Sequence, residues 1–403
     1  MSIWEPTEAE LRDGGSLKWT GMRTKDDEPT MGAWVAEMDF GTAPVVRDAV
    51  VGAIDAGLLG YPPPWAGAAS VTALTQFLDA RFGWVIKEGW VRPFPSVLHG
   101  LRTTIEHLTR PGSAVVVPTP AYMPFLTIPQ SYGRELIEVP SLHVPSPVGH
   151  AGATDPEEAW ALNVDGIEAG LKQGAGLVIL CNPWNPTGRV LTVPELRALQ
   201  DVVSKYDALV FSDEIHAPLV YGDPSSFTSY ASLGPGFAGN TVTAVAASKA
   251  WNVAGLPAAQ MIIPNAELRE KWDGAVGWDH PSALGSVAAV AAYTDGTPWL
   301  TEVLAVLSAN LDLLGEALAG TAVDYCRPQG TYLTWLGFER YDLTESPSSV
   351  LLNDYGVATN DGVSLGKGYE AWARVNAAMS PELWAITVER IAEFARTAPL
   401  KSV

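Results

Sequence analysis

The sequence predicts an α/β fold in which a mostly parallel sheet lies between helices. Four short runs, at residues 113–118, 176–181, 208–213 and 241–247, are continuously apolar, as strands buried on both faces are. Helical patterns separate these runs, the clearest at 192–206. The 38 glycines and 31 prolines are spread between the runs as turn residues, so the chain is expected to fold from end to end.

The helix expected at 192–206 begins with a capping box. Thr192 and Glu195 have the T-x-x-E spacing, and Pro194 lies in the first turn, where a missing N–H costs nothing. The apolar side chains that follow recur on one face, which predicts a crossover helix packed on the sheet. They are Leu196, Leu199, Val203 and Tyr206.

A second amphipathic helix is expected at 381–397. Ser380 is its N-cap and Pro381 its first residue, an arrangement favoured at helix starts. Its buried side is predicted to hold Ile386, Ile391 and Phe394. Because a strand-like run at 330–338 precedes it, this end of the chain is predicted to form a smaller α+β domain.

The expected division is an N-terminal segment (1–45) packing with the small domain, a large domain (46–285) and the small C-terminal domain (286–403). The boundary is sought in the Gly/Pro-marked helical region between 277 and 298. The long polar stretch at 141–160 is expected to be a surface insertion in the large domain.

Composition excludes several classes of protein. With 25 Lys+Arg against 45 Asp+Glu the net charge is −20, which disfavours nucleic-acid binding and anionic membranes. Cys181 and Cys326 are too few and too far apart for a disulfide framework, and the six histidines form no metal-binding helix motif, so no metal is expected. An acidic N-terminus and the lack of a run of about 20 apolar residues predict a cytoplasmic protein.

Three segments carry the chemistry, and each follows a predicted strand. They are CNPWNPTGRV (181–190), SDEIHAPLVY (212–221) and ASKAWNVAGL (247–256). Taken singly, each has a structural explanation: a Pro/Gly turn, a helix-capping acidic pair and a solvated lysine. Because carboxyl ends of parallel strands share one edge of the sheet, where such folds bind ligands, we expect the three to meet in one site.

The residue types in these segments match pyridoxal 5'-phosphate (PLP) chemistry. A lysine amine binds the aldehyde of this cofactor, and Lys249 is the candidate. An acid must face the pyridine nitrogen, and Asp213 ends its own strand. Asn185 and His216 follow strand ends at the same edge and are expected to donate to the phenolate oxygen, although a turn asparagine and a core histidine are the alternatives.

The three segments together resemble the fold type I PLP enzymes of the class I/II aminotransferase superfamily. Their signature asparagine lies in an N-P-x-N-P-x-G turn, and 36 positions separate Asp213 from Lys249, which is similar to the family spacing. WVAEMDF, AYMPF, the histidine of DEIH and SKAWN resemble the cystathionine β-lyase, or carbon–sulfur β-lyase, branch. GYPPP, PSVLHGL and WARVNAA extend the resemblance over nearly the whole chain.

The resemblance implies a seven-stranded sheet in the large domain and further site residues. Tyr122 would stack on the pyridine ring and serve catalysis, and Arg374 would hold the substrate carboxylate through a bidentate contact. Tyr61 would reach the site of a neighbouring subunit, which implies a homodimer with shared active sites. Phosphate contacts would come from Val97, Leu98, Ser248 and the partner's Tyr61, and substrate contacts from Arg374, Tyr61 and Asn185.

The sequence departs from the family at the phosphate end. Pro257 stands where relatives often have a basic residue, so phosphate binding is expected to be weaker, with His99 as a candidate substitute. Trp184 and Trp251 flank the signature residues and are expected to narrow the pocket toward bulky or apolar substrates.

The expected activity is α,β-elimination from cystathionine or another L-cysteine S-conjugate, giving a thiol, pyruvate and ammonia. Transamination is the alternative, because it uses the same residues. Decarboxylation or oxidative deamination is a further variant on this fold. A catalytically silent PLP fold is disfavoured, since such a protein has no chemical need for both Lys249 and Asp213.

Overall fold

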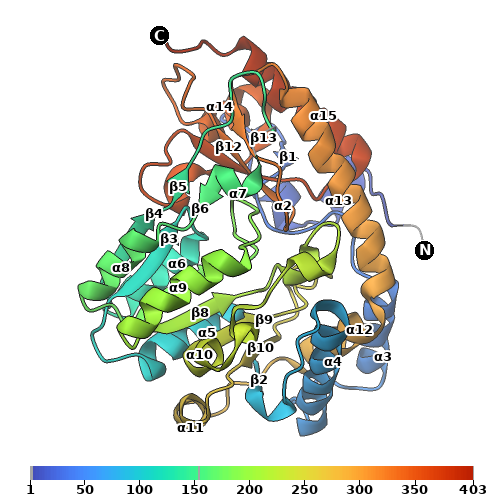
Figure 1. The fold of residues 1–403 in the computed structure, drawn as a ribbon. Helices are drawn as coiled ribbons and strands as arrows, with labels where there is room; N and C mark the ends of the chain where they lie inside the picture. Colours follow the sequence, from blue (N-terminus) through green and yellow to red (C-terminus); the bar gives the residue numbers. More distant parts are fainter. Residues whose placement is uncertain (1–2, 153–154, 403) are drawn as a thin grey trace.

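The computed structural model describes residues 3–152 and 155–402. A seven-stranded sheet in the order β2-β10-β9-β8-β7-β3-β4 forms the centre of the larger part (Figure 1). Strands β9 through β4 pair in parallel, whereas β10 is antiparallel to both of its neighbours. The mostly parallel sheet is therefore confirmed. The strands are β2 Val91–Phe94, β3 Val115–Thr119, β4 Leu136–Pro140, β7 Leu177–Cys181, β8 Leu209–Asp213, β9 Thr241–Val245 and β10 Ala259–Ile262.

The four apolar runs predicted as strands correspond to β3, β7, β8 and β9. The sequence analysis did not identify the remaining three strands of the sheet. The edge strand β2 contains Pro93, a residue tolerated only where one side of the strand needs no backbone donor. The other edge strand, β4, is only partly buried, and β10 begins with Ala259 and Gln260, so neither has the continuous apolar pattern.

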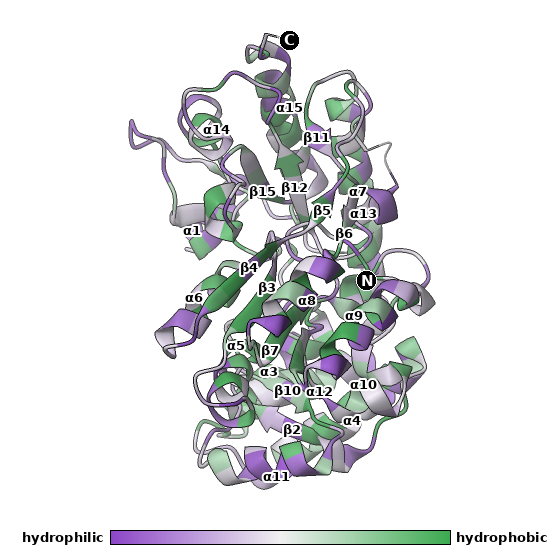
Figure 2. Cartoon of the chain, turned by 60° about the vertical axis from the view of Figure 1, so that its left-hand side comes forward, coloured by the Kyte–Doolittle hydropathy of each residue, from purple (hydrophilic) through white to green (hydrophobic). Residues whose placement is uncertain are grey.

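Alternating side chains of the central strands pack against helices on the two faces of the sheet. Val115, Val117 and Phe211 lie in one core cluster, and Val116 and Val210 in another. Figure 2 shows these central strands as mainly hydrophobic, whereas helices such as α11 alternate polar and apolar stretches. The covering helices are α5 Val97–Thr103, α6 Met123–Ser131 and α11 Ala266–Ala275 on one face, and α8 Val164–Lys172 and α9 Val193–Lys205 on the other.

The crossover helix α9 forms as predicted. The hydroxyl of Thr192 accepts from the backbone N–H of Glu195, and the Glu195 carboxylate accepts from the backbone N–H of Thr192. Leu196, Leu199 and Val203 are buried. The capping box thus begins the helix where its buried face can meet β7 and β8.

The smaller part contains an antiparallel sheet in the order β11-β12-β15-β14. Helix α15 covers it, but the prediction for Ile386 was wrong, because this side chain is 41% exposed; Thr387 and Val388 occupy the buried face instead. The elements are α13 Thr297–Leu318, β11 Asp324–Tyr325, β12 Leu333–Gly337, α14 Pro347–Tyr355, β14 Asn360–Asp361, β15 Trp372–Asn376 and α15 Pro381–Thr397.

The N-terminal segment packs with this smaller part. Strand β1 (Met31–Gly32) pairs in parallel with β13 (Val357–Ala358), and Trp19 lies in the same core cluster as Trp384. Before β1 come α1 (Glu8–Asp13) and α2 (Leu17–Thr20).

Three helices, α3 (Pro44–Asp55), α4 (Pro64–Phe82) and α12 (Ala283–Asp295), pack together beside the large sheet. Because α12 stays with α3 and α4 up to Gly296, we propose that the large and small domains meet there.

The stretch at 141–160 contains strand β5 (Leu142–His143), and β6 (Trp160–Ala161) pairs with it. Residues 153 and 154 lie outside the described part. The stretch also contacts the small domain, since the backbone N–H of Ser146 donates to Asp324 over 3.0 Å. In the described ranges no helix is long and apolar enough to cross a membrane.

Candidate active site

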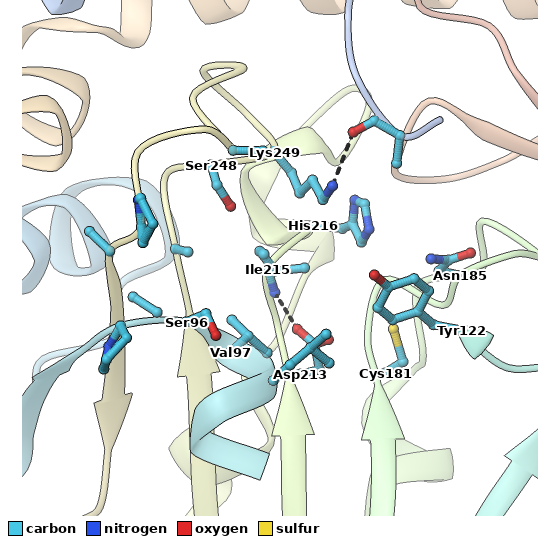
Figure 3. A pocket seen from close by; sticks show the side chains of 18 of the residues that line it. Ser96, Val97, Tyr122, Cys181, Asn185, Asp213, Ile215, His216, Ser248 and Lys249 are labelled. Carbon is cyan, nitrogen blue, oxygen red and sulfur yellow. Dashed lines mark hydrogen bonds between the residues drawn. The ribbon is translucent and has the colours of Figure 1, made fainter. Parts of the chain in front are cut away.

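A cavity of about 280 Å³ opens at the carboxyl edge of β7, β8 and β9. Figure 3 shows Asp213 at the end of β8 and Lys249 above it, with Tyr122 and Asn185 to one side. Eight of the ten residues predicted for the site line this cavity, so the three strand-end segments do meet. The eight are Val97, Leu98, Tyr122, Asn185, Asp213, His216, Ser248 and Lys249.

Asp213 places a carboxyl group at the buried end of the cavity. The side chain is 4% exposed and accepts one hydrogen bond, from the backbone N–H of Ile215 over 3.1 Å. Burial raises the pKa of Asp213 to about 7, although this hydrogen bond and the charge of Lys249 oppose the change. A buried carboxylate with so few partners is stabilised by a cation placed against it.

Lys249 reaches into the cavity from the opposite side. Its Nζ donates to the backbone carbonyl of Ala36 over 3.0 Å. Burial, followed by the nearby charge of Arg374, lowers the pKa of Lys249 to about 8, while Glu37 and Asp213 oppose the change. A substantial fraction of this amine is therefore neutral near pH 8, as a nucleophile or general base must be.

His216 and Tyr122 keep their neutral forms. The imidazole is 2% exposed, and its Nδ1 has no hydrogen-bond partner. Burial, then the charges of Lys249 and Arg374, lower the pKa of His216 to about 3. Burial likewise raises the pKa of Tyr122, so its phenol remains protonated. A neutral imidazole with an unpaired ring nitrogen can form one further hydrogen bond, to a ligand.

Arg374 lies behind Asn185 and does not line the cavity. Its Nη1 donates to Asn185 Oδ1 over 3.2 Å, and its Nη2 donates to Asn360 Oδ1 over 2.5 Å and to the carbonyl of Trp34 over 3.2 Å. The guanidinium is 3% exposed and its Nε has no partner. Burial lowers the pKa of Arg374 to about 10, which leaves it charged and available to a carboxylate near Asn185.

Among the described residues that line the cavity, Lys249 is the one cationic side chain. The described lining therefore offers no second cation at the end expected to hold phosphate. Ser96 caps α5 by accepting from the backbone N–H of His99 over 3.1 Å, and Ser248 and Pro257 lie nearby on the wall. His99 does not compensate for Pro257, because its imidazole lies outside the cavity, 3.6 Å from Asp279.

The two tryptophans expected to narrow the pocket do not line it. Trp184 is buried and donates to the carbonyl of Pro120 over 2.8 Å. Trp251 is also buried and donates to the carbonyl of Gly296 over 3.0 Å. That prediction was wrong because both indoles turn inward to apolar surroundings where their N–H groups find acceptors.

Tyr61 does not take part in the cavity of its own subunit. The residue belongs to the segment that connects α3 and α4, and its side chain is 98% exposed. At this position Tyr61 is free to contact a neighbouring subunit, the role that the family resemblance implies for it.

A buried ion pair fastens the chain segment that passes over Lys249. Lys18 Nζ lies 3.0 Å from Asp39 Oδ1, with side-chain exposures of 1% and 2%. The same ammonium donates to the carbonyl of Ala378 over 2.9 Å, and Trp19 Nε1 donates to Asp39 over 2.9 Å. These contacts tie α2 and the end of β15 to the residues around Ala36.

We expect Lys18→Met to lower the free energy of unfolding by about 3–5 kcal/mol, since it leaves Asp39 buried without its counter-charge. Urea unfolding at one fixed cofactor concentration measures this. Arg47→Ala, which removes the exposed Arg47–Asp48 pair, should cost under about 1 kcal/mol. Equal losses in the two variants would contradict the assignment, and Lys18→Met/Asp39→Asn should recover part of the loss.

The cavity fits PLP. Within the described ranges the buried carboxylate of Asp213 has a hydrogen bond from Ile215 but no salt bridge, so it is suited to face a protonated pyridine nitrogen, and Lys249 lies across the cavity with a partly neutral amine. His216 and the amide group of Asn185, whose oxygen already accepts from Arg374, are placed to donate from one side. The phosphate would meet Ser248 and the backbone of Val97 and Leu98.

The family model for aminotransferase class I and II matches residues 37–391. The chain belongs to this family. It is similar to cystathionine β-lyase of Corynebacterium glutamicum, with 36% identity over 96% of this chain and 98% of the relative. It is also similar to cystathionine β-lyase PatB of Bacillus subtilis, with 32% identity over 86% and 88% of the two chains.

A crystal structure of a candidate PLP-dependent β-cystathionase from Corynebacterium diphtheriae superimposes with a TM-score of 0.86. The identity is 33%, with 98% of this chain and 99% of the other covered. The fold type I aminotransferase architecture, and the resemblance to the carbon–sulfur lyase branch, are thereby confirmed.

Sequence reasoning missed two kinds of site group in this aminotransferase-family chain. Asn360, which accepts from Arg374, lies in the two-residue strand β14 and has no motif around it. The carbonyl of Ala36 is a backbone group, so no residue type marks it. The segment WVAEMDF was the available signal, but its match to the family says nothing about which of its atoms face Lys249.

Proposed function

We propose that this PLP-dependent enzyme is a carbon–sulfur β-lyase acting on cystathionine or a related L-cysteine S-conjugate. The observation that carries the proposal is the buried pairing of Asp213 and Lys249 across one cavity, in a chain whose relatives of 36% and 32% identity are cystathionine β-lyases. The overall reaction consumes one water and gives a thiol, pyruvate and ammonia.

The cofactor, when bound, supplies the electron sink that stabilises the negative charge left by removal of the Cα proton. Lys249 takes that proton with its neutral amine. Arg374 binds the substrate carboxylate through two parallel N–H donors, which orients the Cα–H bond toward Lys249. Asp213 would be negatively charged at the buried end of the site, because a protonated pyridine nitrogen beside it favours the ionised carboxylate.

An assay without any keto acid tests the proposal. Purified protein incubated with L-cystathionine is expected to release pyruvate and a free thiol in equal amounts, and Lys249→Ala protein prepared in parallel should release neither. Transamination shares the site residues but requires an amino-group acceptor. Product formation that depends strictly on an added keto acid would therefore replace the lyase proposal with an aminotransferase.

We propose further that two copies associate through α3, α4 and α12. These helices line an apolar groove that includes Val45, Trp65 and Val290. Trp65 is 58% exposed, and Leu59, next to the lining residue Leu58, is 68% exposed. Tyr61 is 98% exposed and belongs to the segment that connects α3 and α4. A second copy would cover the groove and bring Tyr61 toward the partner's cavity, whose described lining has no cationic side chain besides Lys249.

Mixing two inactive variants tests this sharing. Tyr61→Phe and Lys249→Ala proteins are expected to recover about one quarter of the wild-type activity after subunit exchange, because half of the dimers contain one intact site. Size-exclusion chromatography verifies exchange. Recovery below a few per cent in exchanged dimers would show that Tyr61 serves no neighbouring site.

A further inference from the structure

Residues 34–38, here called the active-site strap, pass between the two domains with their carbonyl groups engaged by side chains. The carbonyl of Trp34 accepts from Arg374, and that of Ala36 accepts from Lys249. Figure 3 shows the Ala36 contact as the dashed line above His216. The strap therefore touches both of the cationic groups that the proposed reaction uses.

The alternate carbonyls, of Val35 and Glu37, both accept from Asn376, and that of Glu37 also accepts from Lys18 Nζ over 3.4 Å. Asn376 Nδ2 donates to the carbonyl of Val35 over 2.6 Å and to that of Glu37 over 2.7 Å. The backbone N–H of Asn376 donates to the carbonyl of Ala33 over 2.9 Å. The carbonyls at odd positions, 33, 35 and 37, thus accept hydrogen bonds from Asn376. Those at even positions accept from the two cationic groups: carbonyl 34 from Arg374 and carbonyl 36 from Lys249.

The orientation of the Asn376 amide is itself fixed. Its Oδ1 accepts from the backbone N–H of Ala378 over 2.7 Å, and the residue is fully buried. Both donors and the acceptor are therefore satisfied, and an amide flip would place oxygen against two carbonyl oxygens. On β15, Asn376 follows Arg374 by two positions, so the two side chains project from the same face of the sheet.

A tyrosine holds the strap from the other side. The hydroxyl of Tyr332 donates over 3.0 Å to the same Ala36 carbonyl that accepts from Lys249. Tyr332 is fully buried, and its ring lies edge-on to His216 with centroids 6.2 Å apart. The Ala36 carbonyl consequently has two donors and little freedom to turn.

We propose that Asn376 is a positioning residue for catalysis: by holding carbonyls 35 and 37, it turns carbonyls 34 and 36 toward Arg374 and Lys249 and so fixes the carboxylate-binding group relative to the base. The proposal rests on the roles assigned to Lys249 and Arg374 under the proposed function. Tyr332 secures only the Ala36 end of the strap, so its contribution concerns Lys249 alone.

The experiment compares Asn376→Ala with Asn310→Ala. Asn310 is a matched control, since it is 3% exposed and its amide also donates to two carbonyls, of Ala377 and Met379, over 2.8 and 2.9 Å. Both variants should lose similar thermal stability. Exchange of the Cα proton of L-alanine in D2O, followed by NMR, isolates proton removal because alanine has no leaving group.

Asn376→Ala is expected to slow this exchange by about tenfold to a hundredfold and to weaken alanine binding, whereas Asn310→Ala leaves both near wild type. A second readout is the rate at which Lys249 is acetylated at pH 8 in cofactor-free protein, relative to the rate of the exposed Lys87. This relative rate should rise about fivefold in Asn376→Ala and stay unchanged in Asn310→Ala. Fivefold is the factor equivalent to the loss of one net hydrogen bond. Equal effects of Asn376→Ala and Asn310→Ala would overturn the proposal.

Tyr332→Phe provides the second test if Asn376→Ala does not fold. It should slow alanine exchange while leaving alanine binding unchanged, because the Trp34 carbonyl and Arg374 are untouched. Unchanged exchange, or an equal loss of binding, would contradict the arrangement. If wild-type protein catalyses no exchange, the assigned role of Lys249 fails instead, so the two failures are distinguishable.

Discussion

Lys249→Ala is expected to lower kcat/KM by about 10⁴-fold or more, because one residue supplies both the covalent attachment of the cofactor and the general base. The structure supports this double role, since the amine is buried, has a pKa near 8 and faces Asp213 across the cavity. The visible absorbance that comes from the lysine-bound cofactor should disappear in the same variant. Steady-state kinetics and an absorbance spectrum together measure the effect.

Lys172→Ala provides the control for Lys249→Ala, because the Lys172 side chain is 60% exposed and pairs with Glu168 in an i,i+4 contact away from the cavity. It should keep wild-type kinetics and spectrum. A primary amine added to Lys249→Ala protein should restore part of the proton-transfer rate if the loss is chemical. A Lys249→Ala protein that retains the lysine-dependent absorbance would show that another residue binds the cofactor.

Asp213→Asn is expected to lower kcat by about 10²–10³-fold, because the neutral amide cannot stabilise the positive charge that the cofactor ring must keep. It should also weaken PLP binding. Steady-state kinetics under saturating cofactor, and fluorescence titration of cofactor-free protein with PLP, measure the two effects separately. The volume of the side chain is nearly unchanged, so the loss reports charge.

The same substitution should stabilise the cofactor-free protein. The folded-state pKa of Asp213, about 7, lies above the ordinary value of 3.8, so the folded form holds more protons than the unfolded form between these two pH values. Stability contributed by this group therefore falls as pH rises from about 4 to 7. The neutral amide of the Asp213→Asn variant carries no such dependence, and the variant should exceed wild type by on the order of 4 kcal/mol at pH 8 and by little at pH 4.

Glu214→Gln is the neighbouring control for this pH effect. Glu214 also has a pKa raised to about 7 by burial, but its carboxylate accepts from Ser212, Ser229 and the backbone N–H of Tyr230. Replacing it should destabilise the protein by breaking this set of hydrogen bonds and should leave PLP binding intact. Equal stability of Asp213→Asn and wild type at every pH would contradict the pKa assigned to Asp213.

The sequence predicted the parallel strands because burial on both faces leaves a continuous apolar pattern, as in β7 and β8. Asn185, Asp213, His216 and Lys249 could be predicted because the carboxyl ends of parallel strands share one sheet edge. The other cavity residues, Val97, Leu98, Tyr122 and Ser248, followed only from the resemblance to the family. The sequence could not predict β10 or β2, whose pairing depends on partners far along the chain. Trp184 and Trp251 were misplaced because a residue's neighbours in sequence do not reveal which way its side chain turns.

Arg374 shows a further limit of sequence reasoning. The residue type and family match identified it, but its oxygen acceptors, on Asn185, Asn360 and Trp34, come from different parts of the chain. No sequence motif indicates that the strap carbonyls or Asn376 make such contacts. Residue chemistry could be predicted where a side chain acts alone, and not where backbone groups brought together by folding complete the site.

The strap also has a consequence for the order of folding during synthesis. Ala36 is made early. Lys249, which donates to its carbonyl, and Asn376, which donates to the neighbouring carbonyls of Val35 and Glu37, are made 213 and 340 positions later. Trp19 and Met31 of the N-terminal segment pack in the small-domain core together with residues of β15. Their apolar side chains therefore lack these packing partners until β15 has left the ribosome. During this interval chaperones can bind the nascent chain. The cofactor can be enclosed only after β15 is in place.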